Sequence, residues 1–439
     1  MDRKKLKRIH FVGIKGVAMA ALAVWYKEAG YTVTGSDTAE KFPTDDVLAK
    51  AGIRAVSFDV KNIAHTRPDL VIYTGAHGGR ENPEVIAASA MGINVLPHGQ
   101  ALGHVMEGKK QISVAGSHGK TTTSAMIATI LSHAGLDPSY AIGCGEIRGL
   151  GLPGHFGNGN IFVAEADEYV TDPGHDLTPR FMWQHPDILV ETNIDWDHPD
   201  VYKSLAQVRA AFRALERQSK VIITGKDFQV THVSCGSERT FFSLERNGMK
   251  LGDFTLKVPG RHNANNAGAA VIACMETGVS RDKIADGLLV FGGTKRRFEF
   301  VGAFGGIRVI DDYAHHPEEI RATLAAAREW YPHSRIIVVF QPHTYSRTKA
   351  LLSDFAHAFT NAQEVVLTDI YSSARETDTL GISGKTLVEE TAKHHANVLY
   401  APDYPAVKKL LSSHMKSGDI IIFMGAGDIY GWSKRFIEK

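Results

Sequence analysis

The chain has 439 residues, more than one hydrophobic core usually supports, so we expect two or three domains. Hydrophobic residues make up 44% and charged residues 22%, with a formal net charge of +1, so charge gives no reason to expect nucleic acid or an anionic membrane as a partner. The three cysteines, Cys144, Cys235 and Cys274, lie far apart and support neither a disulfide framework nor a cysteine-based zinc site.

The amino-terminal stretch MDRKKLKRIHFVGI is basic, but its apolar part is short and interrupted by glycine, unlike a secretory signal. No later apolar run reaches the length that spans a bilayer. We therefore expect a cytoplasmic protein without membrane insertion. Separately, we expect a monomer or a homodimer.

Residues 1–107 alternate short apolar runs with helical patterns. The runs IHFVGI, YTVTGSD, DLVIYTGA and INVLPHG predict strands, and VAMAALAVWYKEAG predicts a helix that ends at Gly30. Such alternation is typical of a parallel sheet covered by helices. We predict a Rossmann-like first domain over this range.

Residues 108–297 are predicted to form a second α/β domain. QISVAGSHGK predicts a strand, and TTTSAMIATILSHAG predicts a helix whose end is marked by Gly135. NIFVAEAD and DILVETNID predict further strands, and Gln207 to Leu215 predicts a helix. A phosphate-loop candidate lies between the first strand and the first helix, so we predict a central P-loop domain.

Residues 298–439 repeat the strand-and-helix alternation and are predicted to form a third, Rossmann-like domain. Its predicted strands are GIRVIDDYAHH, RIIVVFQPH, EVVLTDIY, ANVLYAP and DIIIFMGAG, with PEEIRATLAAAREWY as a helix. The boundary is placed at residue 297 because GGTKRR combines flexible and charged residues.

The stretch VAGSHGKTTT puts Gly116, Gly119, Lys120 and Thr121 between a strand and a helix. The strict phosphate-loop pattern has a glycine six positions before the lysine, where this chain has Val114, so the loop is a shorter variant. Backbone N–H groups and the helix dipole there attract phosphate, while Lys120 can reach the terminal phosphates and Thr121 can offer its hydroxyl to Mg²⁺. We predict ATP or GTP binding; the competing interpretation is a glycine turn with a surface lysine.

Acidic residues follow two neighbouring predicted strands of the central domain. Because parallel strands converge at their carboxyl ends, we expect these side chains to meet near the phosphate loop. Carboxylates there are plausible Mg²⁺ ligands as two clusters, although each residue taken alone is more readily explained as a solvated loop acid. The two clusters are Glu165, Asp167 and Glu168, and Asp195, Asp197, His198 and Asp200.

A second glycine loop, GIKGVAM, follows the first predicted strand and contains Gly13 and Gly16. Lys15 stands where a dinucleotide fingerprint needs a glycine, so a nicotinamide cofactor is disfavoured. A diphosphate on the following helix, with its ribose or base near Ser36 and Asp37, remains reasonable. The alternative is a tight turn that binds nothing.

Together these motifs resemble the Mur ligases, which join amino acids or peptides to UDP-N-acetylmuramic acid. GSHGKTTT is similar to the family's ATP loop, EADE and NIDWDH to its magnesium-binding segments, and GRHNANNAGAA to its adenine-contacting stretch. GTKRRFE, DDYAHHPEEI and FQPHTYSRT resemble the junction and third domain of the branch that adds alanine to muramate. The resemblance covers nearly the whole chain.

The resemblance implies roles for individual residues, with ATP and Mg²⁺ as cofactors. Thr121, Glu165 and His198 would serve the metal, and Lys120, His198, Arg297 and His315 would act in catalysis. Gly13, Gly16, Ser36 and Asp37 would bind the UDP-sugar, and His315, His343 and Arg347 the incoming amino acid. The implied ATP-binding residues are Gly116, Ser117, His118, Gly119, Lys120, Thr121, Thr122, His262, Asn263, Asn266, Arg297 and Asp312.

The implied reaction joins the carboxylate of UDP-N-acetylmuramate to L-alanine through an acyl phosphate, with His315 as a candidate base for the amine. One alternative is a ligase that attaches a recycled murein tripeptide, because the segment after EADEY is long and contains Phe181 and Trp183. Another is a nucleotide-binding regulatory protein that has lost ligation. A zinc site at HHP and QPH is a further, weaker interpretation.

Four positions depart from the family pattern. Lys15 and Ala18 replace glycines in the first loop, and His98 replaces a basic residue before the second domain. Their effect on UDP-sugar contact stays open. Thr344 replaces an arginine common in the alanine-adding branch, which leaves the acceptor open as well.

Overall fold

The computed structural model describes residues 7–196, 198, 200–236, 238–372, 376 and 378–438. The chain divides into two compact units, and each is described by itself. The first comprises Met1–His232, Phe242–Thr255 and Asn265–Thr294, and the second comprises Val233–Phe241, Leu256–Ala264 and Lys295–Lys439.

The first unit begins with a five-stranded parallel sheet in the order β3-β2-β1-β4-β5. The central strand β1 lies between β2 and β4, so the loops that leave the carboxyl ends of these three strands share one edge. The strands are β1 (Arg8–Val12), β2 (Thr32–Asp37), β3 (Ala55–Ser57), β4 (Leu70–Tyr73) and β5 (Asn94–Pro97). The helices are α1 (Val17–Glu28), α2 (Thr44–Lys50), α3 (Lys61–Thr66), α4 (Pro83–Ala90) and α5 (His98–Met106), with the short η1 (Gly79–Glu81) before α4.

The second sheet of this unit has the order β13-β12-β6-β9-β7-β8, in which only β8 runs antiparallel to its neighbour. Strand β6 lies between β12 and β9, which makes its carboxyl end the switch point of the sheet. The strands are β6 (Lys110–Ala115), β7 (Ser139–Ala141), β8 (Gly154–His155), β9 (Ile161–Ala166), β12 (Ile188–Glu191) and β13 (Val221–Thr224). Its helices are α6 (Lys120–His133), α7 (Leu205–Arg217) and α9 (Arg281–Val290), with η2 (Arg180–Trp183) before β12.

Helix α1 joins these two sheets into one unit. All eight residues from Met19 to Tyr26 are buried, so the helix has apolar neighbours around its circumference. Trp25 packs against Phe162 of β9, and a side chain at Gly154 of β8 would collide with the Ala21 carbonyl at 1.9 Å. The first two predicted domains therefore share a hydrophobic core and form a single compact unit.

A hairpin of β10 (Val170–Asp172) and β11 (Asp176–Pro179) connects β9 to η2 and packs against the loop that follows β4. The buried carboxylate of Asp172 accepts the Arg80 N–H at 2.8 Å. A Cβ at Gly79 would lie 2.4 Å from Asp172 Oδ1, so this close approach requires glycine. The hairpin thus fixes the loop that follows β4.

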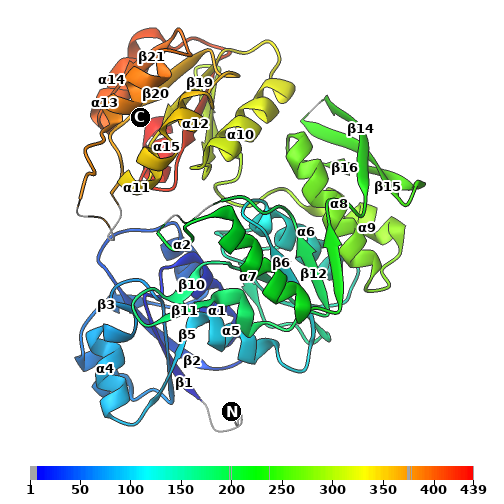
Figure 1. Ribbon diagram of the computed structural model, residues 1–439, viewed down its shortest axis with the longest axis vertical. Helices are drawn as coiled ribbons and strands as arrows, with labels where there is room; N and C mark the ends of the chain where they lie inside the picture. The colour runs from blue at the N-terminus through cyan, green and yellow to red at the C-terminus, as the bar shows by residue number, and fades with distance from the viewer. Residues whose placement is uncertain are drawn as a thin grey trace. The chain divides into compact units, whose positions relative to one another are not determined.

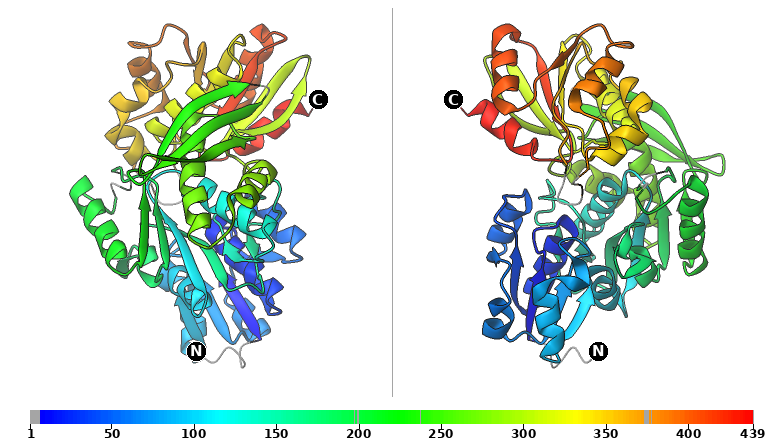
Figure 2. Two further views of the ribbon diagram at one scale, coloured as in Figure 1. Left: turned by 90° about the vertical axis from the view of Figure 1, so that its right-hand side faces the viewer. Right: turned by 60° about the vertical axis from the view of Figure 1, so that its left-hand side comes forward.

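A three-stranded sheet of β14 (Gln229–Gly236), β15 (Arg239–Arg246) and β16 (Met249–Leu256) follows β13, and helix α8 (Arg261–Met275) comes next. The sheet is the long green ribbon in Figure 2. The chain passes between the two compact units within this sheet and within α8.

The second unit holds a six-stranded sheet in the order β17-β18-β22-β19-β20-β21, parallel except for β17. Alternate residues of its strands face two cores: Ile420 and Ile422 pack with α10, and Ile421 and Phe423 pack with α14 and α15. Helices therefore cover both faces (Figure 1). The elements are β17 (Glu299–Phe304), β18 (Ile307–Asp312), α10 (Pro317–Trp330), β19 (Ile336–Phe340), α11 (Tyr345–Ala350), α12 (Leu352–Ala356), β20 (Glu364–Leu367), α13 (Gly384–Thr391), β21 (Val398–Tyr400), α14 (Tyr404–His414), β22 (Ile420–Met424) and α15 (Tyr430–Ile437).

The predicted α/β class with parallel sheets is confirmed. The helix predicted over 207–215 is present and longer, as Leu205–Arg217. Within the described part of the chain, no helix combines the length and the apolar character needed to cross a bilayer.

A pair of carboxyl groups, Glu191 on β12 and Glu216 on α7, makes the central sheet sensitive to pH. Burial, and then the charge of Glu216, raise the pKa of Glu191 to about 7. The folded state therefore holds more protons than the unfolded state between pH 4.5, the usual pKa of a glutamate, and about pH 7. This contribution to stability is present below the unfolded pKa and is lost as pH rises through 7.

We expect Glu191→Gln to flatten this dependence, because the amide stays neutral at every pH. The variant should melt about 1–2 °C higher than the wild type at pH 8 and no higher at pH 5, since a half-buried pair contributes about 1 kcal/mol. Calorimetry at both pH values checks this, with the exposed Glu107→Gln as a control. Equal shifts at both pH values would contradict the assignment.

Candidate active site

The loop from Gly116 to Gly119 follows β6 and leads directly into α6, as predicted. Gly116 has φ +137° and Gly119 has φ +84°, a region that favours glycine. A Cβ at Gly116 would lie 2.0 Å from Thr192 Oγ1, and one at Gly119 would lie 2.6 Å from Asn266 Oδ1. Both glycines are therefore required by backbone conformation and by close neighbours.

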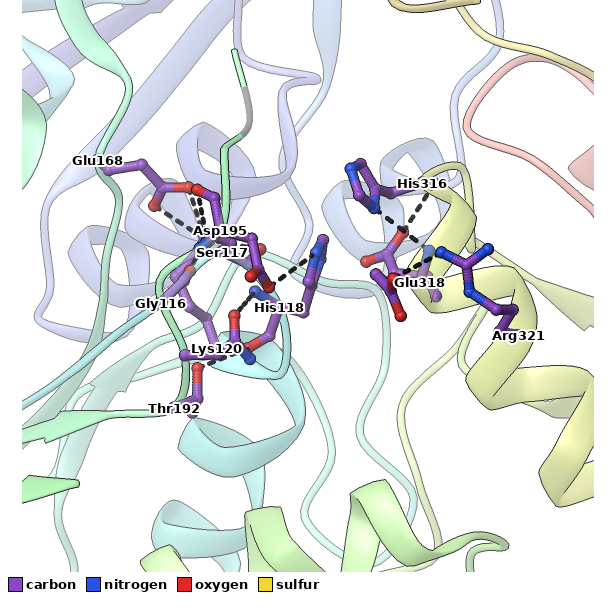
Figure 3. Close-up of polar contacts among 12 residues, drawn as sticks. Gly116, Ser117, His118, Lys120, Glu168, Thr192, Asp195, His316, Glu318 and Arg321 are labelled. Carbon is purple, nitrogen blue, oxygen red and sulfur yellow. Dashed lines mark hydrogen bonds and ion pairs between the residues drawn. The ribbon is translucent and has the colours of Figure 1, made fainter. Parts of the chain in front are cut away.

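Residues that follow β12 hold the loop in place (Figure 3). The hydroxyl of Thr192 donates to the His118 carbonyl at 2.5 Å, and the Asn193 side chain accepts the His118 N–H at 2.9 Å. The Ser117 hydroxyl accepts the Asp195 N–H at 2.8 Å. The loop is thus preorganised by the adjacent strand before any ligand is present.

Lys120 lies among carboxylates. Its Nζ is 2.9 Å from Glu168 Oε2 and also donates to the Gly116 carbonyl. Burial alone would lower the pKa of Lys120, but the charges of Glu168 and Asp167 outweigh it and hold the pKa above its usual value. The side chain is therefore a permanent cation beside the loop.

Oxygen donors suited to a divalent cation meet at the start of α6. The Thr121 hydroxyl donates to Glu165 Oε2 at 3.0 Å, and Glu165 Oε1 accepts the Gly143 N–H at 2.6 Å. His198 is near this set, with Nε2 3.8 Å from Glu168 Oε1 and its ring against Tyr169. A hydroxyl and carboxylates fit Mg²⁺, which completes its coordination with waters and phosphate oxygens.

Across the described residues, no group of three or more histidine, cysteine, aspartate or glutamate side chains is arranged to hold a metal by itself. Of the second acidic cluster, Asp195 lies 3.8 Å from His118 Nε2 and Asp200 accepts the Tyr169 hydroxyl at 2.8 Å. Asp197 lies outside the described residues.

Arg180 of η2 adds a cation that sequence reasoning did not single out. Its Nη1 lies 2.8 Å from Asp167 Oδ2, and its guanidinium sits over the Tyr169 ring. Burial raises the pKa of Asp167, but Arg180 and Lys120 overcome that effect and bring it down to about 2. Asp167 is therefore an anion fixed between two cations.

The glycine loop of the first sheet joins β1 to α1 and is bound to the end of β2. The Lys15 N–H donates to Asp37 Oδ2 at 2.7 Å, and Asp37 Oδ1 accepts the Thr38 N–H at 2.8 Å. The Lys15 ammonium turns toward the following segment, where it donates to the carbonyls of Thr38 and Glu40. Gly13 has φ +83°, as a tight turn requires.

Ser36 faces away from this loop. It is fully buried and donates to Glu84 of α4, which also lies 3.4 Å from His10 Nε2. Asn62 donates to the other oxygen of Glu84 at 2.7 Å. Ser36 therefore belongs to a polar network that joins α3 and α4 to the sheet.

The first turn of α1 lies beside His98 and beside Gly143, whose N–H binds Glu165. His98 at the start of α5 lies with Nε2 3.2 Å from the Ala18 carbonyl, and a Cβ at Gly143 would lie 3.2 Å from Glu165 Oε1 and 3.8 Å from the Ala18 N. Burial, and then the charge of Arg180, lower the pKa of His98 to about 4, so its imidazole is neutral near pH 7. The position that is basic in the family pattern is uncharged here.

Of the predicted adenine-contacting residues, Asn266 belongs to the first unit and lies beside Gly119. His262 and Asn263 belong to the second unit, where the Asn263 side chain donates to the Pro259 carbonyl at 2.7 Å. Burial, and then the charge of Arg297, lower the pKa of His262 to about 4.

The remaining predicted residues lie in the second unit. Asp312 accepts the Phe298 N–H at 2.7 Å and so holds the turn that carries Arg297, whose Nη1 is 3.5 Å from Glu319 Oε1. Burial raises the pKa of Asp312. His315 Nδ1 lies 3.2 Å from Glu319 Oε2, and the ring centroids of His315 and His343 are 6.2 Å apart.

Helix α10 begins beside these histidines, and its first turn is stabilised by a capping box between His316 and Glu319. Arg347 is buried on α11. His315 and His343 lie close together on the loops that follow β18 and β19 of the same sheet.

Three family models match successive parts of the chain, and all three belong to the Mur ligases. Residues 8–110 match the model "Mur ligase family, catalytic domain", 114–228 the "Mur ligase middle domain" and 296–427 "Mur ligase, glutamate ligase domain". The UDP-N-acetylmuramate–L-alanine ligase of Desulfitobacterium hafniense is 39% identical, over 96% of this chain and 97% of that protein.

Two solved structures are similar as well. The UDP-N-acetylmuramate-alanine ligase of Thermotoga maritima has a TM-score of 0.84 and 30% identity, covering 99% of this chain and 98% of that one. A murein peptide ligase of Psychrobacter arcticus has a TM-score of 0.71 and 24% identity over 98% of both chains, which shows a shared fold.

A matched pair of glycine variants tests the loop geometry. Gly119 (φ +84°) and Gly135 (φ +83°) share one backbone conformation, but only Gly119 has Asn266 within reach of a new Cβ. We expect Gly119→Ala to abolish the rise in melting temperature caused by Mg-ATP, because the loop must move. Gly135→Ala should cost about 1 kcal/mol in stability and keep the full response to Mg-ATP. An equal loss of response in both variants would contradict this geometry.

Proposed function

The chain belongs to the Mur ligase family, and we propose that it joins the carboxylate of UDP-N-acetylmuramate to the amino group of L-alanine while ATP is converted to ADP and phosphate. Two UDP-N-acetylmuramate–L-alanine ligases align with 96% and 100% of the chain. The observation that carries the proposal is that the first turn of α1, which follows the loop after β1, lies beside Gly143, whose N–H binds Glu165 next to Thr121. A sugar nucleotide at that turn would lie near a bound ATP.

On this proposal ATP binds the loop from Gly116 to Thr122. Lys120 exchanges part of its contact with Glu168 for the β- and γ-phosphates, and Asn266 lies on the adenine side of Gly119. Because the loop is already held by Thr192 and Asn193, binding costs little ordering of the backbone. His262, Asn263, Arg297 and Asp312, which belong to the second unit, are proposed to bind ATP on the strength of the family resemblance.

The Thr121 hydroxyl and the Glu165 carboxylate would hold Mg²⁺, with His198 acting directly or through water. The ion would neutralise phosphate charge. Gly13, Gly16 and Asp37 form the edge that binds the UDP-sugar. Ser36 contributes indirectly by holding Glu84 and with it the strand end.

The proposed reaction has two steps, and in each the nearby cations offset negative charge. A muramoyl carboxylate oxygen attacks the γ-phosphorus and ADP leaves, which gives an acyl phosphate. The alanine nitrogen attacks the acyl carbon, loses a proton and expels phosphate. Lys120 offsets the repulsion between two anions in the first step, and His198 and Arg297 are candidates to stabilise the tetrahedral intermediate of the second.

His315 is the candidate base, because its ring lies between Glu319 and His343 in the predicted acceptor site. His343 and Arg347 complete this site. We further propose that the functional domains follow the predicted division 1–107, 108–297 and 298–439, and that the reaction takes place in the cytoplasm, where ATP is available.

The segment that suggested a murein tripeptide ligase has a structural explanation. Phe181 is fully buried and packs against Phe212, and the Trp183 Nε1 donates to Thr171 at 3.3 Å while its ring lies close to Gly99. Phe181 therefore belongs to the core beside α7, and Trp183 supports the hairpin. L-Alanine therefore remains the proposed acceptor.

Product analysis tests the acceptor. Purified protein with Mg-ATP and UDP-N-acetylmuramate should yield an alanine adduct by mass spectrometry, with one ADP per adduct, and little product from the tripeptide. A tripeptide adduct alone would replace alanine as acceptor. No adduct and no substrate-dependent ATP hydrolysis would favour a regulatory protein instead.

Lys120→Met tests the phosphate loop. We expect kcat to fall by at least about 100-fold, because the variant lacks the cation that offsets phosphate charge. Lys61 is exposed, and Lys61→Met removes one positive charge just as Lys120→Met does; this control variant should keep wild-type kcat. A kcat within about threefold of wild type for Lys120→Met would contradict the assignment.

A further inference from the structure

His77 occupies an unusual position in the loop between β4 and α4. Its backbone has φ +54°, a left-handed conformation that is uncommon outside glycine and asparagine. Such residues persist only where the surrounding structure holds them, and they concentrate at functional sites. His77 is not part of any motif that the sequence resemblance used.

The loop around His77 is held from several sides. The Asn82 side chain donates to the His77 carbonyl at 3.1 Å, and the Gly79 N–H donates to the Ala76 carbonyl at 3.0 Å. The hairpin fixes the next residues, because Asp172 accepts the Arg80 N–H. The conformation of His77 is therefore imposed by tertiary contacts.

The imidazole of His77 lies over the glycine loop of the first sheet. Its Cδ2 is 3.8 Å from the position of a Cβ on Gly13, and its Nε2 is 3.8 Å from Asp37 Oδ1. The Phe58 ring flanks it, with centroids 5.5 Å apart. The side chain is 24% exposed, so it reaches solvent at the edge where the sugar nucleotide is proposed to bind.

A diphosphate at the start of α1 needs donors beyond the backbone N–H groups, and two nearby candidates are otherwise engaged. The Lys15 ammonium donates to two carbonyls and lies 3.3 Å from Asp45 Oδ1. His98 is neutral near pH 7 and faces the Ala18 carbonyl. His77 can present a ring N–H beside Gly13 without breaking any of these contacts.

We propose that His77 binds the diphosphate of the UDP-sugar, donating a hydrogen bond from Nε2 to a phosphate oxygen while Asp37 lies next to the ring. This inference rests on the proposed function. On this proposal, the hydrogen-bond donor to the diphosphate comes from the loop after β4, because the Lys15 ammonium is engaged elsewhere. The hairpin residue Asp172 is a positioning residue in this scheme, because it holds the loop and does not touch the ligand.

The test uses the full chain and calorimetric titration with UDP and with uridine. His77→Asn tolerates the left-handed backbone but is too short to reach, and His77→Gly removes any backbone strain. Both variants should bind UDP about tenfold more weakly than the wild type, as expected for one charge-assisted hydrogen bond. Uridine affinity and the melting response to Mg-ATP should not change.

His65→Asn is the matched control, because His65 is an exposed histidine on α3, a helix beside the same five-stranded sheet. It should leave UDP affinity unchanged. Unchanged UDP affinity in both His77 variants would overturn the inference, and so would an equal loss for UDP and uridine, which would indicate contact with the base. Failure of the wild type to bind either UDP or UDP-N-acetylmuramate would instead overturn the proposed function.

Discussion

Helix α1 packs against two sheets at once, and the position of the loop after β1 relative to the central sheet depends on that packing. Its first turn completes the glycine loop after β1, while its buried middle, from Met19 to Tyr26, lies on strands of the central sheet. Because a packed core does not deform continuously, the helix fixes the loop after β1 relative to Gly143 and to Glu165, which binds Thr121 at the start of α6. The proposed transfer of a phosphoryl group to a carboxylate needs this fixed relation, since reacting atoms must meet within a few ångströms.

Electrostatics around the phosphate loop is balanced before any ligand binds. Lys120 contacts Glu168, and Arg180 contacts Asp167, so each buried or half-buried charge has a partner of opposite sign. Unpaired charges in such a place would be costly. An incoming triphosphate with its metal can take over these partners without first creating a bare charge. The same arrangement explains why Lys120 remains protonated although burial opposes it.

The second unit is organised by side chains that bind backbone groups. Asp312 accepts two N–H groups, from Phe298 and Ala314, on either side of the end of β18. Arg296 pairs with Asp311 at 3.1 Å and donates to the Gly425 carbonyl, which ties the start of the unit to the end of β22. These contacts present Arg297 and His315 from one short region. The backbone on either side of these two side chains is therefore held by buried polar contacts.

The sequence by itself determined the local features: the parallel α/β class, the strand–loop–helix around Lys120, and the glycines whose backbone conformation no other residue adopts without strain. These follow from periodicity and from φ restrictions, which act over a few residues. Only the tertiary structure decided that Glu168, 48 residues away, is the partner of Lys120, that Thr192 and Asn193 clamp the loop, and that His77 lies over Gly13. Strand order determines which carboxyl ends are neighbours, and that order depends on long-range packing such as that of α1 on strands of both sheets, which no local pattern encodes.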